Sequence, residues 1–97
     1  MKTFAVFTYF VENVAEKRAP YREAHLAHLR ELHEKGTLVL GGALLDPMDA
    51  GLLILRAAAR EDIEAILASD AYAQNGIWTK IVVREWNVVV GSLAPAA

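Results

Sequence analysis

Four apolar stretches, separated by two stretches with helical spacing, most constrain how this chain can fold. Residues 3–10 are β-branched or aromatic at most positions, which is typical of a strand with apolar side chains on both faces. Residues 38–44 and 52–57 are two further apolar runs, and the Asp-Pro step between them predicts the turn of a hairpin. Residues 77–90 form a long last strand rich in valine, isoleucine and tryptophan.

The two intervening segments have the spacing of amphipathic helices. The first is expected from about residue 20 to residue 35, because its proline fits only the first turn of a helix and Gly36 ends it. A short turn precedes this helix, in which Asn13 and Glu16 have the spacing of a capping pair. The second helix is expected over residues 60–70. The element order is therefore β-α-β-β-α-β.

This element order is compatible with one simple fold. With right-handed crossovers it predicts an α+β, ferredoxin-like fold, in which a four-stranded antiparallel sheet carries both helices on one face. A chain of 97 residues can bury one modest core but rarely two. We therefore expect a single domain over residues 1–91, followed by a flexible C-terminal tail at residues 92–97.

Two helices can cover only one face of such a sheet. Alternation along the first and last strands nevertheless places apolar side chains on both faces. The first strand divides into Phe4, Val6 and Phe10 against Ala5, Phe7 and Tyr9, and the last strand divides into Ile81 and Val83 against Trp78, Val82 and Trp86. An uncovered apolar face of this size needs a partner, so the sequence predicts a homodimer that packs sheet against sheet.

Composition argues against several classes of protein. The chain has no cysteine, so it has no disulfide, thiol nucleophile or thiolate metal site. Its formal net charge is -2 and both signs are scattered, which leaves no basic stripe for nucleic acid. No apolar run approaches the length of a membrane span, and the N-terminus lacks a signal-peptide cleavage site. We expect a cytoplasmic protein that binds neither nucleic acid nor membrane.

Two sequence features argue against metal or nucleotide cofactors. His25 and His28 are three residues apart, but no His-Glu-x-x-His pattern completes a metal site. The pair Gly41-Gly42 lacks the Lys-Ser/Thr that follows a phosphate-binding loop. We therefore expect no metal and no cofactor, and the glycine pair predicts a bulge or a close backbone approach.

Polar side chains on the inward sides of the two helices are the candidates for a functional site. Three leucines define the inward arc of the first helix, which also holds His25, Arg22 and Arg18, while His28 lies nearer its margin. On the second helix, Asp70 falls on the inward arc near the C-terminus, where the helix dipole disfavours a carboxylate unless something compensates.

Because the two helices of this fold run antiparallel, His25 and Asp70 should lie at the same end of the molecule. A carboxylate that holds an imidazole fixes its tautomer and raises its basicity, as enzymes require for general acid/base catalysis. The alternative is a hydrogen-bonded core histidine beside an aspartate that caps a turn. Helical spacing alone favours this structural alternative.

Three segments together resemble a known family. Residues 22–29 carry an Arg-x-x-His-Leu helix, residues 41–42 are a glycine pair in the second strand, and residues 70–72 are Asp-Ala-Tyr. This combination resembles the YciI-like family of the dimeric α+β barrel superfamily, which usually has proline where this chain has Ala71. The resemblance implies an active-site histidine at His25 and an aspartate at Asp70.

The resemblance also implies a class of reaction. It points to a cofactor-independent lyase, isomerase or dehydrochlorinase of small molecules, in which His25 moves a proton and Asp70 orients it. Arg22 would hold an anionic oxygen, and Tyr72 would help to bind the substrate. A non-catalytic ligand-binding or accessory dimer is an alternative, and a cofactor-free monooxygenase of the same superfamily is another. A hydrogen-bonded His25–Asp70 pair at the wall of an open pocket would favour a functional site over a structural pair.

Overall fold

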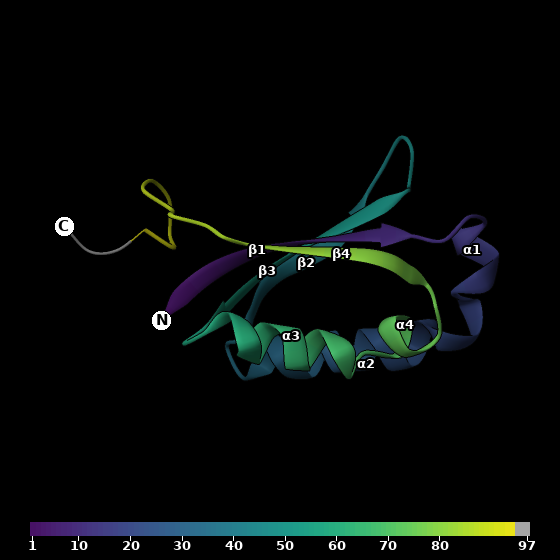
Figure 1. The fold of residues 1–97 in the computed structure, drawn as a ribbon, viewed down its shortest axis with the longest axis horizontal. Coiled ribbons are helices and arrows are strands. Elements are labelled where there is room, and N and C mark those ends of the chain that lie inside the picture. The colour runs from purple at the N-terminus through teal and green to yellow at the C-terminus, as the bar shows by residue number, and fades with distance from the viewer. Residues whose placement is uncertain (95–97) are drawn as a thin grey trace.

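The computed structural model describes residues 1–94, which form one four-stranded antiparallel sheet with helices on one side (Figure 1). The strands are β1 (Lys2–Phe10), β2 (Leu38–Leu44), β3 (Ala50–Ala57) and β4 (Trp78–Glu85), in the spatial order β2-β3-β1-β4. The main helices are α2 (Arg22–Glu34) and α3 (Arg60–Ala68). The predicted α+β, ferredoxin-like arrangement is confirmed.

The described residues also include three short helical segments. They are α1 (Val14–Lys17), the 3₁₀ segment η1 (Ala19–Tyr21) and α4 (Ala71–Gln74). The predicted capping pair before the first helix is wrong, because Asn13 makes no side-chain cap and instead adopts φ 58°, a conformation that asparagine tolerates. The predicted end of this helix is confirmed: Gly36 follows it with φ 81°, which glycine adopts without strain.

The core lies between the sheet and helices α2 and α3. Val6, Leu55 and Ile63 are its least exposed aliphatic side chains, and they come from β1, β3 and α3. No helix within residues 1–94 combines the length and the apolar character that a membrane crossing requires. Of the tail expected to be flexible, residues 95–97 lie outside the described residues, and Ala94 closes a turn by donating its backbone N–H to the carbonyl of Gly91.

Two predictions about the last strand are wrong. Strand β4 ends at Glu85 rather than at residue 90, because β1 supplies its ladder only as far as Thr3, whose carbonyl accepts the N–H of Trp86. Trp78 lies in the helix-covered core together with Val83, rather than on the face opposite Val83. The pairing with β1 shifts by one residue between Tyr9 and Phe10, and such a bulge reverses the alternation of side chains beyond it.

Candidate functional site

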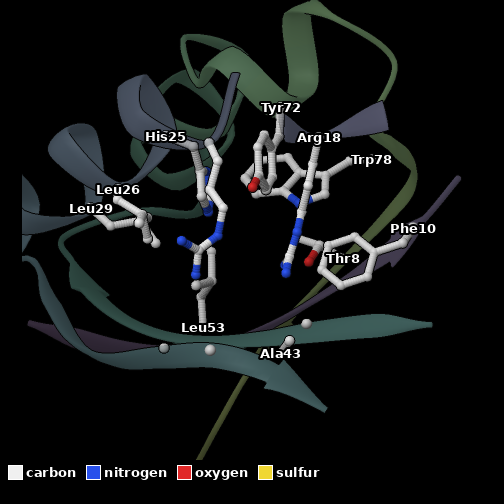
Figure 2. Close-up of a pocket in the computed structure, with 14 residues that line it drawn as sticks. Thr8, Phe10, Arg18, His25, Leu26, Leu29, Ala43, Leu53, Tyr72 and Trp78 are labelled. Carbon is white, nitrogen blue, oxygen red and sulfur yellow. The ribbon is translucent and has the colours of Figure 1, made fainter. Parts of the chain in front are cut away.

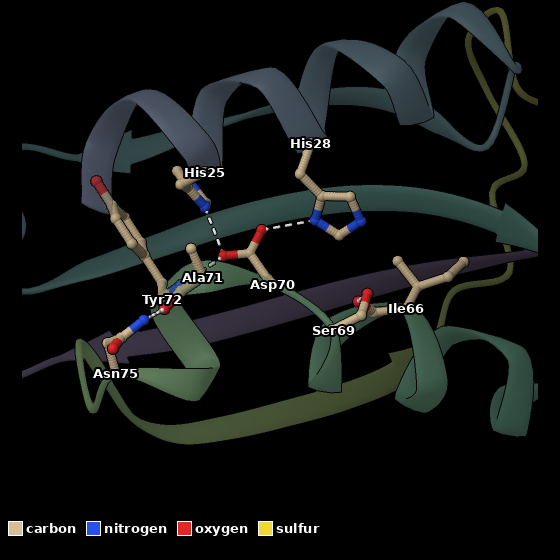
Figure 3. Close-up of polar contacts among 8 residues, drawn as sticks. All are labelled: His25, His28, Ile66, Ser69, Asp70, Ala71, Tyr72 and Asn75. Atoms are coloured by element: carbon tan, nitrogen blue, oxygen red, sulfur yellow. Dashed lines mark hydrogen bonds and ion pairs between the residues drawn. The ribbon is translucent and has the colours of Figure 1, made fainter. Parts of the chain in front are cut away.

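Asp70 lies at the junction of α3 and α4, beside the first half of α2 (Figure 3). The helix predicted over residues 60–70 ends earlier, at Ala68. The prediction that Asp70 lies within the last turn of this helix is therefore wrong. It is instead the N-cap of α4, with an extended backbone, and its side chain accepts the N–H of Tyr72 at 2.9 Å. A carboxylate is favourable at this position because the first N–H groups of a helix lack backbone partners.

The two oxygens of Asp70 each meet a histidine of α2. Oδ2 lies 2.7 Å from Nδ1 of His25, and Oδ1 lies 2.8 Å from Nδ1 of His28 (Figure 3). The Asp70 side chain is 1% exposed, whereas the side chains of His25 and His28 are 10% and 23% exposed. The antiparallel helices therefore bring His25 and Asp70 together, as the topology predicts, and they add a second histidine to the pair.

Three hydrogen bonds set the charge of Asp70. Burial by itself would raise its pKa, but the hydrogen bonds from His25, from His28 and from the backbone of Tyr72 outweigh burial and hold the pKa of Asp70 below its usual range. The carboxylate is therefore ionised at neutral pH and can only accept hydrogen bonds. Nδ1 of each histidine must then carry a proton.

His25 forms part of the wall of a cavity of about 150 Å³ between α2 and the sheet (Figure 2). Every fully buried side-chain nitrogen or oxygen of the described residues has a hydrogen-bond partner, and Nδ1 is the atom of His25 that has one. Nε2 of His25 is therefore not sealed in the core. Asp70 does not line the cavity and lies behind the imidazole.

Aromatic rings hold the imidazole of His25 in place. The ring of Tyr72 stacks on it with centroids 3.7 Å apart and planes 6° apart, and Trp78 meets it edge-on at 5.6 Å. Both aromatic residues also line the cavity. Burial raises the pKa of Tyr72, although Arg18 and Arg22 oppose the shift, so its hydroxyl stays protonated at neutral pH.

Two arginines and a floor of small residues complete the cavity. Arg18 and Arg22 line it from the α2 side, and the Arg18 side chain extends into it (Figure 2). Opposite them, the strands contribute small residues, including Gly41 and Ala43 from β2 and Gly51 from β3. A Cβ at Gly41 would lie 2.5 Å from a methyl of Leu53, whereas one at Gly42 would meet nothing within 4 Å, so a side chain rather than backbone approaches the glycine pair. The cavity thus combines two positively charged side chains, aromatic walls and a floor of small residues.

The structure places the predicted site residues as follows. His25, Arg22 and Tyr72 line one cavity, and Asp70 supports the first of them from behind. Sequence reasoning missed the contact of His28 with Asp70. On sequence grounds, Asp70 pairs with His25 alone, and His25 and His28 are considered together only as metal ligands. A carboxylate has two oxygens, however, and can accept from two donors 60° apart on a helix. Within residues 1–94, no group of three or more acidic or histidine side chains is arranged to hold a metal ion.

The family model for the YCII-related domain matches residues 2–87. The chain belongs to this family. An uncharacterised protein of Haemophilus influenzae is 30% identical over 95 residues, which cover 89% of this chain and 97% of that protein. The "derivative of benzaldehyde biosynthesis cluster protein C" of Emericella nidulans is 37% identical over 71 residues, which cover 63% of this chain and 72% of that protein.

Among solved structures, this YCII-related chain is similar in fold to the 5-chloro-2-hydroxyhydroquinone dehydrochlorinase of Burkholderia phenoliruptrix in complex with 2,5-dihydroxybenzoquinone. The TM-score is 0.77, the sequence identity is 22%, and the match covers 87% of this chain and 92% of that one. At this identity the likeness is one of fold, and it supports the α+β architecture described above.

Proposed function

We propose that this protein is a cofactor-independent enzyme that moves a proton on a small, planar, acidic molecule, with His25 as the proton carrier. The observation that carries the proposal is the hydrogen-bonded His25–Asp70 pair with one imidazole nitrogen left at a cavity wall. A purely structural pair would be enclosed on all sides. The resemblance to a dehydrochlorinase supports a reaction of the lyase or isomerase type.

The ligand class follows from the cavity walls. A cavity of about 150 Å³ suits one ring with few substituents. The aromatic rings of Tyr72 and Trp78 in the cavity wall favour a planar ligand, and the guanidinium groups of Arg18 and Arg22 favour an anionic oxygen. The quinone in the solved relative is a ligand of this kind. We infer a hydroxylated aromatic or quinoid substrate.

The proton would move in a defined direction. Because Asp70 accepts the Nδ1 proton, the neutral imidazole of His25 has its lone pair on Nε2, which is the general base. Arg22 and Arg18 stabilise the oxyanion that remains on the substrate. In an elimination, a leaving group such as chloride would depart with its bonding electron pair. In an isomerisation, His25 would return the proton to another atom.

A ligand experiment with one cavity variant tests this proposal. Ala43 lies on β2 at the floor of the cavity, whereas Asp70 lies at the start of α4. Ala43→Leu should therefore fill the cavity and leave the His25–Asp70 pair intact. Wild-type protein should bind 2,5-dihydroxybenzoquinone with a thermal shift and convert a chlorinated hydroquinone, and Ala43→Leu should lose both. Binding without turnover of any hydroquinone tested would favour the non-catalytic alternative. Equal binding by both proteins would place the ligand outside this cavity.

We also propose that the functional unit is a homodimer. Figure 1 shows the described helices on one face of the sheet and none on the other. The uncovered face carries Phe7, Tyr9, Leu40, Val82 and Trp86, of which Leu40 and Trp86 are 60% and 49% exposed. Packing of two such faces would remove this apolar surface from water, as the resemblance to the dimeric α+β barrel superfamily implies.

Light scattering at micromolar concentration should therefore give twice the monomer mass of 10.6 kDa. Trp86→Lys, which places a charge on the uncovered face far from the cavity, should shift the mass towards the monomer. A monomeric wild-type protein would contradict the proposal.

A further inference from the structure

His28 is the polar residue of this cluster that the proposed mechanism does not use. It lies one helical turn from His25 on α2, does not line the cavity, and directs Nδ1 to Oδ1 of Asp70 at 2.8 Å (Figure 3). A histidine on the open surface can satisfy its ring nitrogens with water, so this contact with a buried carboxylate indicates a specific role for His28. The 23% exposure of its side chain and the 1% exposure of Asp70 place the contact at the edge of the core.

The carboxylate of Asp70 has few ways to satisfy its oxygens. Oδ2 accepts from both Nδ1 of His25 and the backbone of Tyr72, whereas Oδ1 accepts from His28. No other hydrogen bond to Oδ1 is present within the described residues. Without His28, this oxygen would need to turn toward another donor, and any rotation of the carboxylate would also move Oδ2 away from His25.

We propose that His28 is a positioning residue of the site: its Nδ1–H fixes the Asp70 carboxylate so that Oδ2 keeps the proton of His25 on Nδ1 and the lone pair on Nε2. This role rests on the proposed use of His25 as the base. His28 touches neither the cavity nor a ligand in it and acts through Asp70 alone. The site is then a three-residue chain, His28–Asp70–His25, in place of a pair.

Charged groups surround the His28–Asp70–His25 chain on several sides. Asp70 faces His28 from the α3–α4 junction, and Glu31 is the carboxylate near it on α2 itself, where it pairs with Lys35 at 3.0 Å. Arg18 and Arg22 line the same cavity as His25, from the α2 side. Within the described residues, Asp70 is the carboxylate to which Nδ1 of His28 is hydrogen-bonded.

Two substitutions at His28 and one at His33 form a matched set that tests this role. In His28→Asn, the amide nitrogen takes the place of Nδ1 and can still donate to Oδ1, whereas His28→Ala removes the donor. His33→Asn is the control, because His33 lies on the same helix and donates to the carbonyl of Leu38 away from the cavity. The readout is the tautomer of each histidine in the ligand-free protein, which the chemical shifts of the ring nitrogens in ¹⁵N NMR report directly.

In the wild-type protein, neutral His25 and His28 should both carry the proton on Nδ1. His28→Ala should lower the ratio of the Nδ1–H to the Nε2–H form of His25 by about tenfold. His28→Asn should restore the wild-type ratio, and His33→Asn should leave it unchanged. A proton on Nε2 of wild-type His28 would overturn the proposal, as would an unchanged ratio in His28→Ala.

If His28→Ala does not fold, the wild-type tautomers and the His28→Asn variant still decide the question, because a loss of the Nδ1–H form of His25 in His28→Asn would also overturn it. These measurements need no ligand and no turnover. A failure of the proposed function, seen as absent binding and absent catalysis, is therefore distinguishable from a failure of the role proposed for His28.

Discussion

Replacement of His25 by asparagine should lower turnover by about 10²- to 10⁴-fold, the range that a positioned general base contributes. The asparagine amide can still donate to Oδ2 of Asp70, so the buried carboxylate keeps its partner. What is lost is Nε2, the nitrogen at the cavity wall. The variant should therefore fold and form the same dimer while it loses the proton carrier.

Steady-state kinetics on wild type, His25→Asn and the control His33→Asn check this expectation. The loss should appear in kcat, and binding of 2,5-dihydroxybenzoquinone should change by less than about tenfold, because the arginines and aromatic walls remain. If His25→Asn keeps more than about a tenth of the wild-type kcat, another group moves the proton. A loss confined to binding would make His25 a ligand contact only.

The fold was predictable because its signals are local and repeated. Apolar runs and helical spacing give the β-α-β-β-α-β order, and Gly36 ends α2 where a left-handed residue is required. The face of Trp78 was not predictable in this way. One extra residue in the pairing of β4 with β1 reverses the alternation, and no local signal marks a bulge that depends on the partner strand.

The site was predictable in part for the same reason. Helical phase places His25 inside α2, and antiparallel helices bring it to Asp70. The surroundings of Asp70 depend on where α3 ends, and the ends of helices are poorly determined by periodicity. A helix two residues shorter converts a carboxylate opposed by a helix dipole into the N-cap of the next helix.

The same local geometry explains why Ala71 can replace the proline usual in the family. Ala71 is the first residue of α4, where proline is favoured but its N–H is not needed. Asp70 before it has φ -73° and ψ 143°, an extended conformation that a following proline would also select. The N-cap hydrogen bond to Tyr72 holds Asp70 in this conformation without proline.

Asp70→Asn should have the second large effect, because it removes the charge that three donors share. An amide offers one oxygen where the carboxylate offers two, so at least one of the donors from His25, His28 and Tyr72 loses its acceptor. A buried donor left without a partner costs about 1–3 kcal/mol. The free energy of unfolding at neutral pH should fall by about this amount, and turnover should fall because Nδ1 of His25 is no longer held as a donor.

The loss of stability in Asp70→Asn should depend on pH. The pKa of Asp70 is lower in the folded than in the unfolded protein, so the unfolded state binds more protons near and below pH 4. The stabilisation by the carboxylate is therefore fully present above the unfolded pKa of about 3.9 and is lost as the pH falls through the folded value. The difference in unfolding free energy between wild type and Asp70→Asn should be largest above about pH 5 and should shrink below about pH 4.

Urea unfolding of both proteins from pH 6 to pH 3 measures this difference, and Asp49→Asn is the matched control. Asp49 is exposed in the hairpin, and no side-chain hydrogen bond to it is present within the described residues, so its replacement should leave stability nearly unchanged at every pH. A constant difference between wild type and Asp70→Asn down to pH 3 would mean that the Asp70 carboxylate does not stabilise the fold through its charge. His25 would then be held by packing on Tyr72 and Trp78 rather than by Asp70.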